Sequence, residues 1–296
     1  MRILITGGSG FVGGALKQFL LAQGHEVVIL SRSGGDFQWD IAFGYVDPAA
    51  FEGVDAIVHL AGAGIAEERW SAARKRELVN SRVRGTAVLY QALSTIPHSI
   101  KTIISASAIG FYGSDAGEQE CLETSPAGLD FLADCTKQWE TAVDQIASLG
   151  LRVVKVRIGL VLGATGGIFP VISKPIRWGL GANLGSGKQW QSWIHITDLV
   201  RIFNEMLVNS ALSGVYNGVA PEPIRAGEMN KQIAKALHRP FFLPSIPGFL
   251  LRLVLGEMAC LVLGGSRVSS AKLVKDASFS FTFVRFDEAL KELTHV

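Results

Sequence analysis

The amino-terminal part of the chain alternates between short apolar runs and one longer stretch with helical spacing. The runs RILIT (2–6) and HEVVILSR (25–32) are short and mainly apolar, as strands buried on both faces are. Between them, FVGGALKQFLLAQG (11–24) repeats apolar residues with helical spacing and closes on Gly24, a typical helix stop. The pattern predicts a strand, a glycine-rich turn, a helix and a second strand, which together form one βαβ unit.

The same alternation continues through the middle of the chain. Further strands are predicted at VDAIVHLAG (54–62), KTIISASAIGFYG (101–113) and LRVVKVRIGLVLG (151–163). The basic stretch ARKRELVNSRVR (73–84) has helical spacing, and we interpret it as a solvated helix face. Strands separated by helices predict an α/β protein with a Rossmann-type, doubly wound parallel sheet. Ligands of such sheets bind outside the carboxyl ends of the strands.

The second half of the chain has a different pattern. Residues 163–199 are rich in glycine and aromatic residues, and they predict loops and short strands over the mouth of the ligand site. Within them we expect His195 to be a hydrogen-bonded strand residue and Asp198 to be a helix N-cap. We place a boundary near residue 240. It divides the chain into a Rossmann domain (1–239), which includes part of a substrate lobe, and a small domain (240–296) packed on that lobe.

The small domain is predicted to contain three elements. Residues 246–264 are apolar and predict a buried helix and its connection. SFSFTF (278–283) alternates like a strand, and a closing amphipathic helix follows it. The stretch 246–265 contains Arg252 and Glu257, which argue against a membrane-spanning helix, so we expect no membrane contact.

Composition excludes several classes of protein. Hydrophobic residues make up 48% of the chain and charged residues 18%, so a large core is available. The net charge of +2 is not gathered into a basic stripe, which argues against nucleic acid. The three cysteines, 121, 135 and 260, form no CxxC pair. We therefore expect no metal site, and reduced thiols in a cytoplasmic protein with no leader before RILIT.

The turn after the first strand has the composition of a dinucleotide-binding site. Its glycines permit a tight turn and let the backbone approach a pyrophosphate, and the helix N-terminus then faces the anion. The residues assigned to this contact are Gly7, Gly8, Ser9, Gly10, Phe11, Val12 and Gly13. The end of the third predicted strand, Leu60, Ala61 and Gly62, is made mostly of small residues and lets the dinucleotide backbone lie close.

The end of the second strand selects the cofactor. Sites for NAD usually carry an acidic residue there, which binds the ribose 2′-hydroxyl. This chain has Ser31 and Arg32 instead. A guanidinium binds a 2′-phosphate through charge-assisted hydrogen bonds, whereas a carboxylate repels it. The sequence therefore predicts NADP(H) in preference to NAD(H), with an ordinary surface arginine as the alternative.

Together these motifs resemble extended short-chain dehydrogenase/reductases, the superfamily of nucleotide-sugar epimerases and dehydratases. The resemblance rests on TGGSGFVG, HLAG, RGT, the serine-containing strand that ends in FYG, RIGLVLG, GSGKQWQSWIHITDLV and GVYNGV. Other stretches narrow it to the epimerase family proteins of the YfcH type, over essentially the whole chain: ERW, SRVRGT, DCTKQWE, GLGANLGSGKQ and GGSRVSSAKLVKDASFSFTF.

The resemblance implies a catalytic pair that the chain does not carry. In the superfamily a tyrosine exchanges a proton with the substrate oxygen, and a lysine four residues later lowers the pKa of that tyrosine. Here the tyrosine position falls on Phe131 and the lysine position on Cys135. The alternative register, Ala133 with Lys137, does not restore the pair either.

The remaining functional positions are partly present. The resemblance places the serine that holds the substrate oxygen at Ser107, with Ser105 as the alternative, and it places Arg82 where the superfamily has an asparagine. Ser105 and Val161 are assigned to the cofactor site. Arg82 is a candidate for binding phosphate or an anionic substrate.

Three further side chains have more than one possible role. Glu77 either orients Arg82 or meets the ribose, unless the two form an ordinary surface ion pair. Tyr112 is a candidate acid or base, or else its hydroxyl caps the strand end. Cys135 is a candidate thiol acid or base, or else a small packing residue.

Two functions follow, from different classes. The first is an NADP(H)-dependent oxidoreductase or epimerase acting on a small carbonyl or alcohol, with Ser107, Tyr112 and Cys135 as catalytic candidates. A nucleotide-sugar epimerase in the strict sense is a weaker variant of this. The second is a non-enzymatic protein that binds NADPH and responds to it, with a regulatory role linked to cell division. Either would act as a monomer or a homodimer.

Overall fold

The computed structural model describes residues 1–294, in which an eight-stranded sheet forms the centre of the larger domain. The strand order is β12-β8-β6-β5-β1-β2-β3-β4, and all neighbours are parallel except β3 and β4. The strands run over β1 (Arg2–Thr6), β2 (Glu26–Ser31), β3 (Phe37–Asp40), β4 (Tyr45–Val46), β5 (Ala56–His59), β6 (Thr102–Ala108), β8 (Arg152–Ile158) and β12 (Gly214–Gly218). The predicted Rossmann-type parallel sheet is confirmed.

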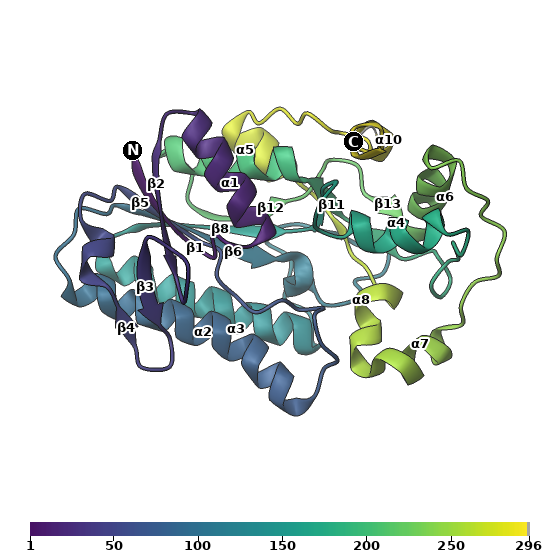
Figure 1. The fold of residues 1–296 in the computed structure, drawn as a ribbon, viewed down its shortest axis with the longest axis horizontal. Coiled ribbons are helices and arrows are strands. Elements are labelled where there is room, and N and C mark those ends of the chain that lie inside the picture. Colours follow the sequence, from purple (N-terminus) through teal and green to yellow (C-terminus); the bar gives the residue numbers. More distant parts are fainter. Residues whose placement is uncertain (295–296) are drawn as a thin grey trace.

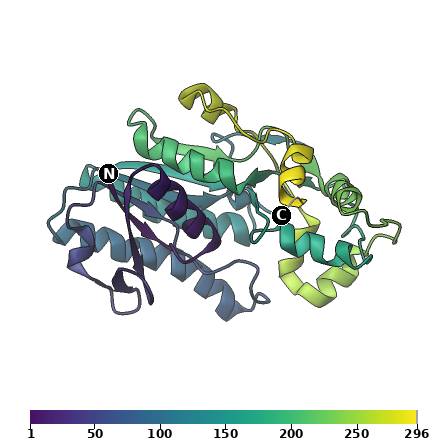
Figure 2. The ribbon, with the colours of Figure 1, turned by 45° about the horizontal axis from the view of Figure 1, so that its top comes forward.

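Helices cover both faces of this sheet, as Figures 1 and 2 show. One face carries α1 (Phe11–Ala22) and α5 (Ile196–Val208), and the other carries α2 (Ala72–Thr95) and α3 (Phe131–Ile146). Because strand residues alternate between faces, Ile3 and Ile5 pack in one core and Leu4 in the other. The chain therefore crosses the sheet from side to side, as the periodicity predicts.

A smaller lobe lies beyond the carboxyl ends of β6 and β8, at the right of Figure 1. Its helices are α4 (Phe169–Arg177), α6 (Ala226–Ala236), α7 (Gly248–Leu255), α8 (Cys260–Leu263) and α10 (Phe286–Thr294). Its short strands are β9 (Leu160–Leu162), β10 (Trp190–Gln191), β11 (Trp193–His195) and β13 (Ile224–Arg225), and β7 (Glu120–Cys121) pairs with β14 (Arg267–Val268). Single-turn helices occur in both parts of the molecule. They are η1 (Pro48–Phe51), η2 (Ile109–Tyr112), η3 (Ala147–Leu149) and η4 (Gly256–Ala259).

The end of the chain contacts both parts of the molecule. Helix α9 (Ala271–Ala277) returns to the large domain, where Leu273 is fully buried in the same core as Ile5. Helix α10 then packs on α6, and Phe286 and Leu290 lie in the core of the lobe. The tail therefore packs on the lobe through α10, as predicted, whereas α9 packs against the large domain.

His195 is the last residue of β11 and its ring bonds to Glu292 at 2.9 Å, so the prediction of a hydrogen-bonded strand residue is confirmed, whereas the predictions for Asp198 and for residues 278–283 are wrong. Helix α5 begins at Ile196, and its N-cap is His195, whose ring accepts a hydrogen bond from Thr197 N. Asp198 is in the first turn, and its carboxylate accepts from the backbone N–H groups of Thr282 and Phe283 at 2.9 Å. The predicted strand at 278–283 does not form, because this segment bonds to a carboxylate and not to a neighbouring strand.

Three further predictions are wrong. Residues 163–199 contain a helix, α4, which the two prolines at 170 and 175 concealed. Helix α7 has no buried residue, although its apolar sequence predicts burial. The stretch 73–84 is not simply a solvated face, because Arg74 and Arg82 turn inward. Within residues 1–294, no helix is both long enough and apolar enough to cross a membrane.

Candidate functional site

The turn between β1 and α1 is built for a close approach of backbone and ligand. Gly7 has a φ of 73°, and a Cβ there would lie 2.9 Å from Ala61 N. A Cβ on Gly13 would lie 2.3 Å from Gly7 O, so only glycine lets the helix begin this close to the turn. Gly10 is the N-cap and supplies no side-chain cap, which leaves the first N–H groups of α1 available to an anion. These residues fit a dinucleotide pyrophosphate.

Phe11 connects this turn to the lobe. Cβ atoms added to Gly163 and Gly166 would each lie 2.3 Å from its ring, so the ring packs directly on this glycine-rich loop. Val12 and Val161 pack at the edge of the main core, and Val161 O accepts a hydrogen bond from Ile168 N. The predicted cofactor residues Phe11, Val12 and Val161 therefore lie close to one another. Ser9 is exposed on the turn.

The end of β2 presents one free cation. Arg32 is exposed and forms no ion pair with a residue in the described part of the chain. Ser31 is buried and donates a hydrogen bond to Ser33 O at 2.7 Å. The carboxylate of Asp36 accepts from Ile29 N at 2.8 Å, so it is engaged toward the middle of β2. Arg32 thus places a positive charge near the strand end, and a guanidinium of this kind can bind a phosphate.

The end of β5 is held by a buried histidine. His59 bonds to Thr6 Oγ1 at 2.7 Å through Nδ1 and to Thr86 Oγ1 at 3.1 Å through Nε2. Burial lowers the pKa of His59 to about 4, so the ring is neutral at neutral pH. The loop of Leu60, Ala61 and Gly62 follows, and Leu60 N donates to Thr6 O. This support fixes the loop against the glycine turn.

Arg82 reaches the site from α2, beside that loop. Its guanidinium donates to Ala63 O at 3.0 Å and to Leu78 O at 2.9 Å, and its Cζ lies 5.2 Å from the ring centre of Trp139. Burial lowers the pKa of Arg82, but an arginine remains charged at neutral pH. Glu77 pairs instead with Arg74 at 2.9 Å, so the expected partnership of Glu77 with Arg82 does not form.

The first turn of α3 presents the two substituted positions. Asp130 caps the helix by accepting from Ala133 N. Phe131 packs edge-on against Trp70, with 5.0 Å between ring centres. Cys135, one turn later, is buried, and burial raises the pKa of its thiol against the opposing charge of Arg82. Lys137 is exposed, and the residue four positions before it is Ala133 and not a tyrosine.

Ser107 and Tyr112 belong to a buried polar network beneath the site. Ser107 Oγ donates to Glu140 Oε1 at 2.5 Å, and Arg157 holds both oxygens of that carboxylate at 2.8 and 2.9 Å. Arg157 also donates to the Tyr112 hydroxyl, which donates in turn to Asn217 Oδ1 at 2.6 Å. Burial above all raises the pKa of Tyr112 to about 12. Both hydroxyls are therefore already bonded within the protein.

Sequence analysis did not identify three members of this network, which are Glu140, Arg157 and Asn217. Burial opposes ionisation of Glu140, yet the bonds from Arg157 and Ser107 leave its pKa below the usual value. Arg157 stands among apolar residues in the strand 151–163, and a charge in such a strand signals a buried partner. Nothing local in the sequence marks Glu140 or Asn217. Ser105 is fully buried and donates to Ala106 O, so its side chain turns away from solvent.

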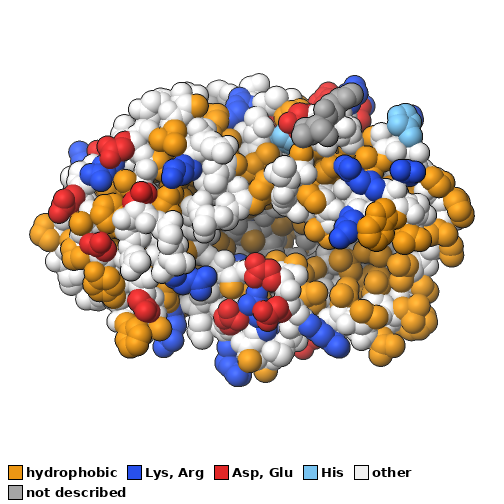
Figure 3. Space-filling model, viewed as in Figure 1, with side chains coloured by type: hydrophobic (Ala, Val, Ile, Leu, Met, Phe, Trp, Pro, Cys, Tyr) orange, Lys and Arg blue, Asp and Glu red, His pale blue; other side chains and the backbone are white. Residues whose placement is uncertain are grey.

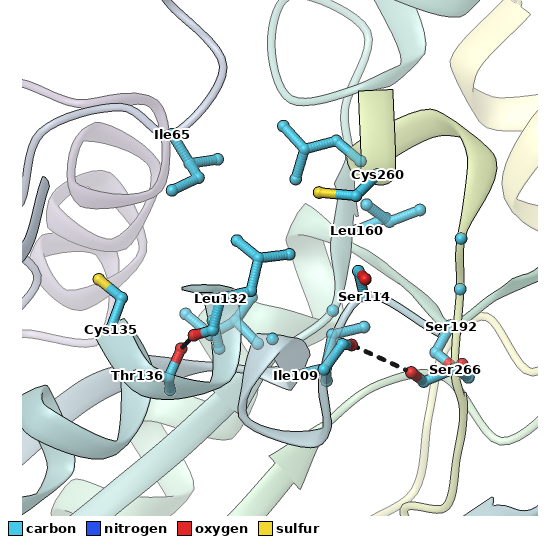
Figure 4. Close-up of a pocket in the computed structure, with 18 of the residues that line it drawn as sticks. Ile65, Ile109, Ser114, Leu132, Cys135, Thr136, Leu160, Ser192, Cys260 and Ser266 are labelled. Carbon is cyan, nitrogen blue, oxygen red and sulfur yellow. Dashed lines mark hydrogen bonds between the residues drawn. The ribbon is translucent and has the colours of Figure 1, made fainter. Parts of the chain in front are cut away.

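A cavity of about 250 Å³ opens above this network, between the large domain and the lobe. Figure 4 shows Ile65, Leu132 and Cys135 on one side, facing Leu160 and Cys260 on the other. Its walls are mostly apolar, and they also include the following residues: Arg82, Ala108, Ile109, Gly110, Thr136, Trp139, Ile158, Gly159, Trp190, Gln191, Ser192, Leu261, Gly264, Gly265 and Ser266. Neither Ser107 nor Tyr112 lines it.

The fold and the glycine turn define a Rossmann-type nucleotide-binding protein with a lobe over the carboxyl ends of its strands. Comparison with known proteins identifies its family. Residues 3–217 match the NAD dependent epimerase/dehydratase family, and residues 246–293 match a domain of unknown function, DUF1731. The chain belongs to the NAD dependent epimerase/dehydratase family, whose members are NAD(P)-binding proteins. Within this family it is similar to the proteins named epimerase family proteins.

Its relatives match along nearly the whole chain. An Arabidopsis thaliana protein, "Epimerase family protein SDR39U1 homolog, chloroplastic", is 37% identical over 99% of this chain and 86% of its own. The Bacillus subtilis epimerase family protein YfhF is 33% identical over 99% of this chain and 98% of its own. The crystal structure of human epimerase family protein SDR39U1 (isoform2) with NADPH is 34% identical, covers 100% of this chain and 99% of its own, and has a TM-score of 0.89.

Proposed function

We propose that the protein is an NADP(H)-dependent oxidoreductase that acts on a small, mainly apolar carbonyl or alcohol compound. One observation carries the proposal. The cavity opens at the carboxyl ends of β6 and β8, on the same edge of the parallel sheet as the glycine turn after β1. A substrate in the cavity and a dinucleotide on the turn would therefore meet at this edge.

The choice of NADP(H) rests on charge at the end of β2. Arg32 is free to meet a 2′-phosphate, and Asp36 is engaged elsewhere. The human relative was crystallised with NADPH, which supports the same choice. When bound, the cofactor supplies the hydride chemistry, and the chain supplies position and proton handling.

We assign the proton to Cys135. It is the titratable group of α3 that lines the cavity, and burial keeps its thiol protonated. As a substrate carbonyl is reduced, its oxygen takes the proton from Cys135 Sγ, and the charge of Arg82 stabilises the thiolate that remains. Ser107 and Tyr112, as the network stands, hold Glu140 and Arg157 under the cavity floor and act as positioning residues.

The test is NADPH oxidation with a panel of aldehydes and ketones of increasing apolar chain length. Removing a general acid typically costs about 10²–10⁴ in rate, so we expect Cys135→Ala to lower kcat by that order while NADPH affinity is unchanged. The matched control is Cys121→Ala, because Cys121 is also buried but lies in a separate cluster. Full turnover in Cys135→Ala would remove the thiol from the mechanism.

Ser107→Ala separates two roles for that serine. If turnover falls strongly in a variant that remains folded and binds NADPH, Ser107 leaves Glu140 to reach the substrate and is catalytic. If turnover follows the stability loss alone, it is a positioning residue.

A second function is favoured by the closed network. Because the hydroxyls of Ser107 and Tyr112 are already bonded and no Tyr–Lys pair is present, the same fold would also serve a protein that binds NADPH without turning it over. Such a protein would respond to the cofactor through its lobe. This second function predicts tight NADPH binding, no oxidation of NADPH with any substrate, and altered amide hydrogen exchange in residues 256–266 when NADPH replaces NADP⁺.

A further inference from the structure

An apolar surface patch lies at the outer end of the lobe, away from the cavity. We call it the lobe patch and define it by six exposed side chains: Trp178, Leu180, Phe242, Phe249, Leu253 and Val254. Each is at least 59% exposed, which is unusual for a group of large apolar residues. Figure 3 shows the corresponding gathering of hydrophobic side chains at the lower right, over the region where Figure 1 places α7.

The patch is one surface because backbone contacts tie its segments together. Ile246 N donates to Asn183 O, and Gly185 N donates to Ile246 O, so the segment before α7 runs beside the turn after α4. A Cβ on Gly181 would lie 2.8 Å from the Phe241 ring, which holds the neighbouring turn in place. On α7, the exposed positions Phe249 and Leu253 share one helix face, and Val254 is exposed on its flank.

The unpaired charges around the patch are positive, since the acidic residue next to α7, Glu257, is paired with Lys75. The stretch 163–190 contains three Lys or Arg residues, the stretch 237–256 contains two, and neither contains Asp or Glu. Three of these cations, Lys174, Arg177 and Arg252, are exposed on α4 and α7 and form no ion pair with a residue among those described. Lys174 instead lies 5.7 Å from the ring centre of Trp178.

This combination selects among the possible occupants. A second copy of the chain, docked by the same face, would bring each set of unpaired cations against its twin. A contiguous group of six large apolar side chains is rare on a surface that faces only water. Aromatic and aliphatic side chains on a helix, fringed by unpaired lysine and arginine, match the interface of an anionic lipid bilayer.

In place of the expected absence of membrane contact, we propose that the lobe patch docks the protein on the surface of a membrane that contains anionic lipid. Helix α7 lies in the plane of the interface, with Phe249, Leu253 and Val254 among the lipid chains and headgroups. Lys174, Arg177 and Arg252 contact the phosphate groups. The docking requires neither cofactor nor substrate, so it stands independently of the proposed oxidoreductase activity.

Co-sedimentation of the full chain with vesicles tests the proposal. Vesicles of phosphatidylcholine alone are compared with vesicles that also contain phosphatidylglycerol, at low and high salt. We expect binding only to the anionic vesicles, and weaker binding as the salt concentration rises. Failure of the wild-type chain to bind anionic vesicles at low salt would overturn the proposal.

Two variants separate the apolar and electrostatic parts. Phe249→Ser with Leu253→Ser removes the apolar contact. Lys174→Glu with Arg177→Glu and Arg252→Glu reverses the fringe and is expected to weaken partitioning by on the order of a hundredfold, since each basic residue near an anionic surface contributes about fivefold. The matched controls are Phe43→Ser, at a position that is 88% exposed, and a triple change of Lys101, Lys137 and Lys275 to Glu.

NADPH affinity, measured for every variant, confirms that each remains folded. The proposal predicts unchanged cofactor binding, full vesicle binding by both controls and loss of vesicle binding by both patch variants. A different result would identify a second copy as the occupant: a wild-type dimer in sedimentation velocity that Phe249→Ser with Leu253→Ser converts to monomer, with no vesicle binding. That result would overturn membrane docking.

Discussion

Single residues at the carboxyl edge of the sheet determine what the site admits. Cys135 lies one turn of helix after Phe131, at the position where the resemblance predicts a lysine, and it lines the cavity together with the half-buried Arg82. The positive charge that the resemblance assigns to α3 therefore comes instead from α2. At the other end of the cofactor site, Arg32 is a free cation at the end of β2. Both substitutions change charge without changing the fold around them.

Replacing Arg32 tests the cofactor preference at this scale. Hydrogen bonds to charged groups contribute about 1.5–3 kcal/mol, so Arg32→Asp should raise the Kd of NADPH by roughly 10- to 100-fold. The Kd of NADH should change little or fall, because a carboxylate accepts from a ribose 2′-hydroxyl. Fluorescence titration of the same variant with both cofactors measures this. Equal weakening of NADH and NADPH would show that the substitution disturbs the turn and not the 2′-phosphate contact.

At the scale of elements, a buried ion pair joins α3 to β8. Glu140 is on the helix and Arg157 on the strand, and both are almost fully buried. Such a pair is costly to break, because either partner alone leaves an uncompensated charge in the interior. It fixes the helix that presents Cys135 over the strand whose end forms the cavity floor.

Glu140→Gln should therefore lower the free energy of unfolding at pH 7 by about 3–5 kcal/mol. The folded-state pKa of Glu140 lies below its unfolded value. Its stabilising contribution is thus fully present above the unfolded pKa and is lost as the pH falls through the folded pKa. Urea unfolding between pH 7 and pH 3 should show a smaller loss of stability on acidification in Glu140→Gln than in the wild type. Glu120→Gln, at an exposed pair with Arg267, serves as control and should cost less than about 1 kcal/mol.

The sequence predicted the sheet and the glycine turn because both depend on local patterns. Apolar runs, Gly24 as a helix stop and glycines that admit no Cβ are all read within a few residues. The errors lie where a distant partner decides. Asp198 resembles an N-cap, but its carboxylate binds backbone N–H groups 84 and 85 residues away. Helix α7 resembles a core helix, but nothing in the described chain covers it. No local pattern reports either fact.

At the scale of the whole molecule, the last residues hold the two parts together. Leu273 on α9 is buried in the core under α1 and α5, and Leu290 on α10 is buried in the lobe. Lys75 on α2 and Glu257 on η4 form a further ion pair across the mouth of the cavity. The family model that covers 246–293 therefore describes a segment whose contacts are spread over both parts.

We expect the protein to unfold as one cooperative unit for this reason. Leu273→Ala should destabilise the whole chain by about 2–5 kcal/mol, with a single shifted transition in the thermal melt. Val274→Ala is the matched control. The side chain of Val274, next to Leu273, is 43% exposed, so its truncation should lower the free energy of unfolding only slightly. Two separate transitions in Leu273→Ala would show that the lobe and the sheet melt independently.

The cavity takes its walls from the sheet domain and from the last part of the chain. Ala108, Cys135 and Ile158 come from the sheet domain, whereas Cys260, Leu261 and Ser266 come from the last sixth of the sequence. Substitutions in that tail alter the shape of the cavity without touching Gly7, Gly13 or Arg32. Swapping tails between relatives is the corresponding route to engineered specificity.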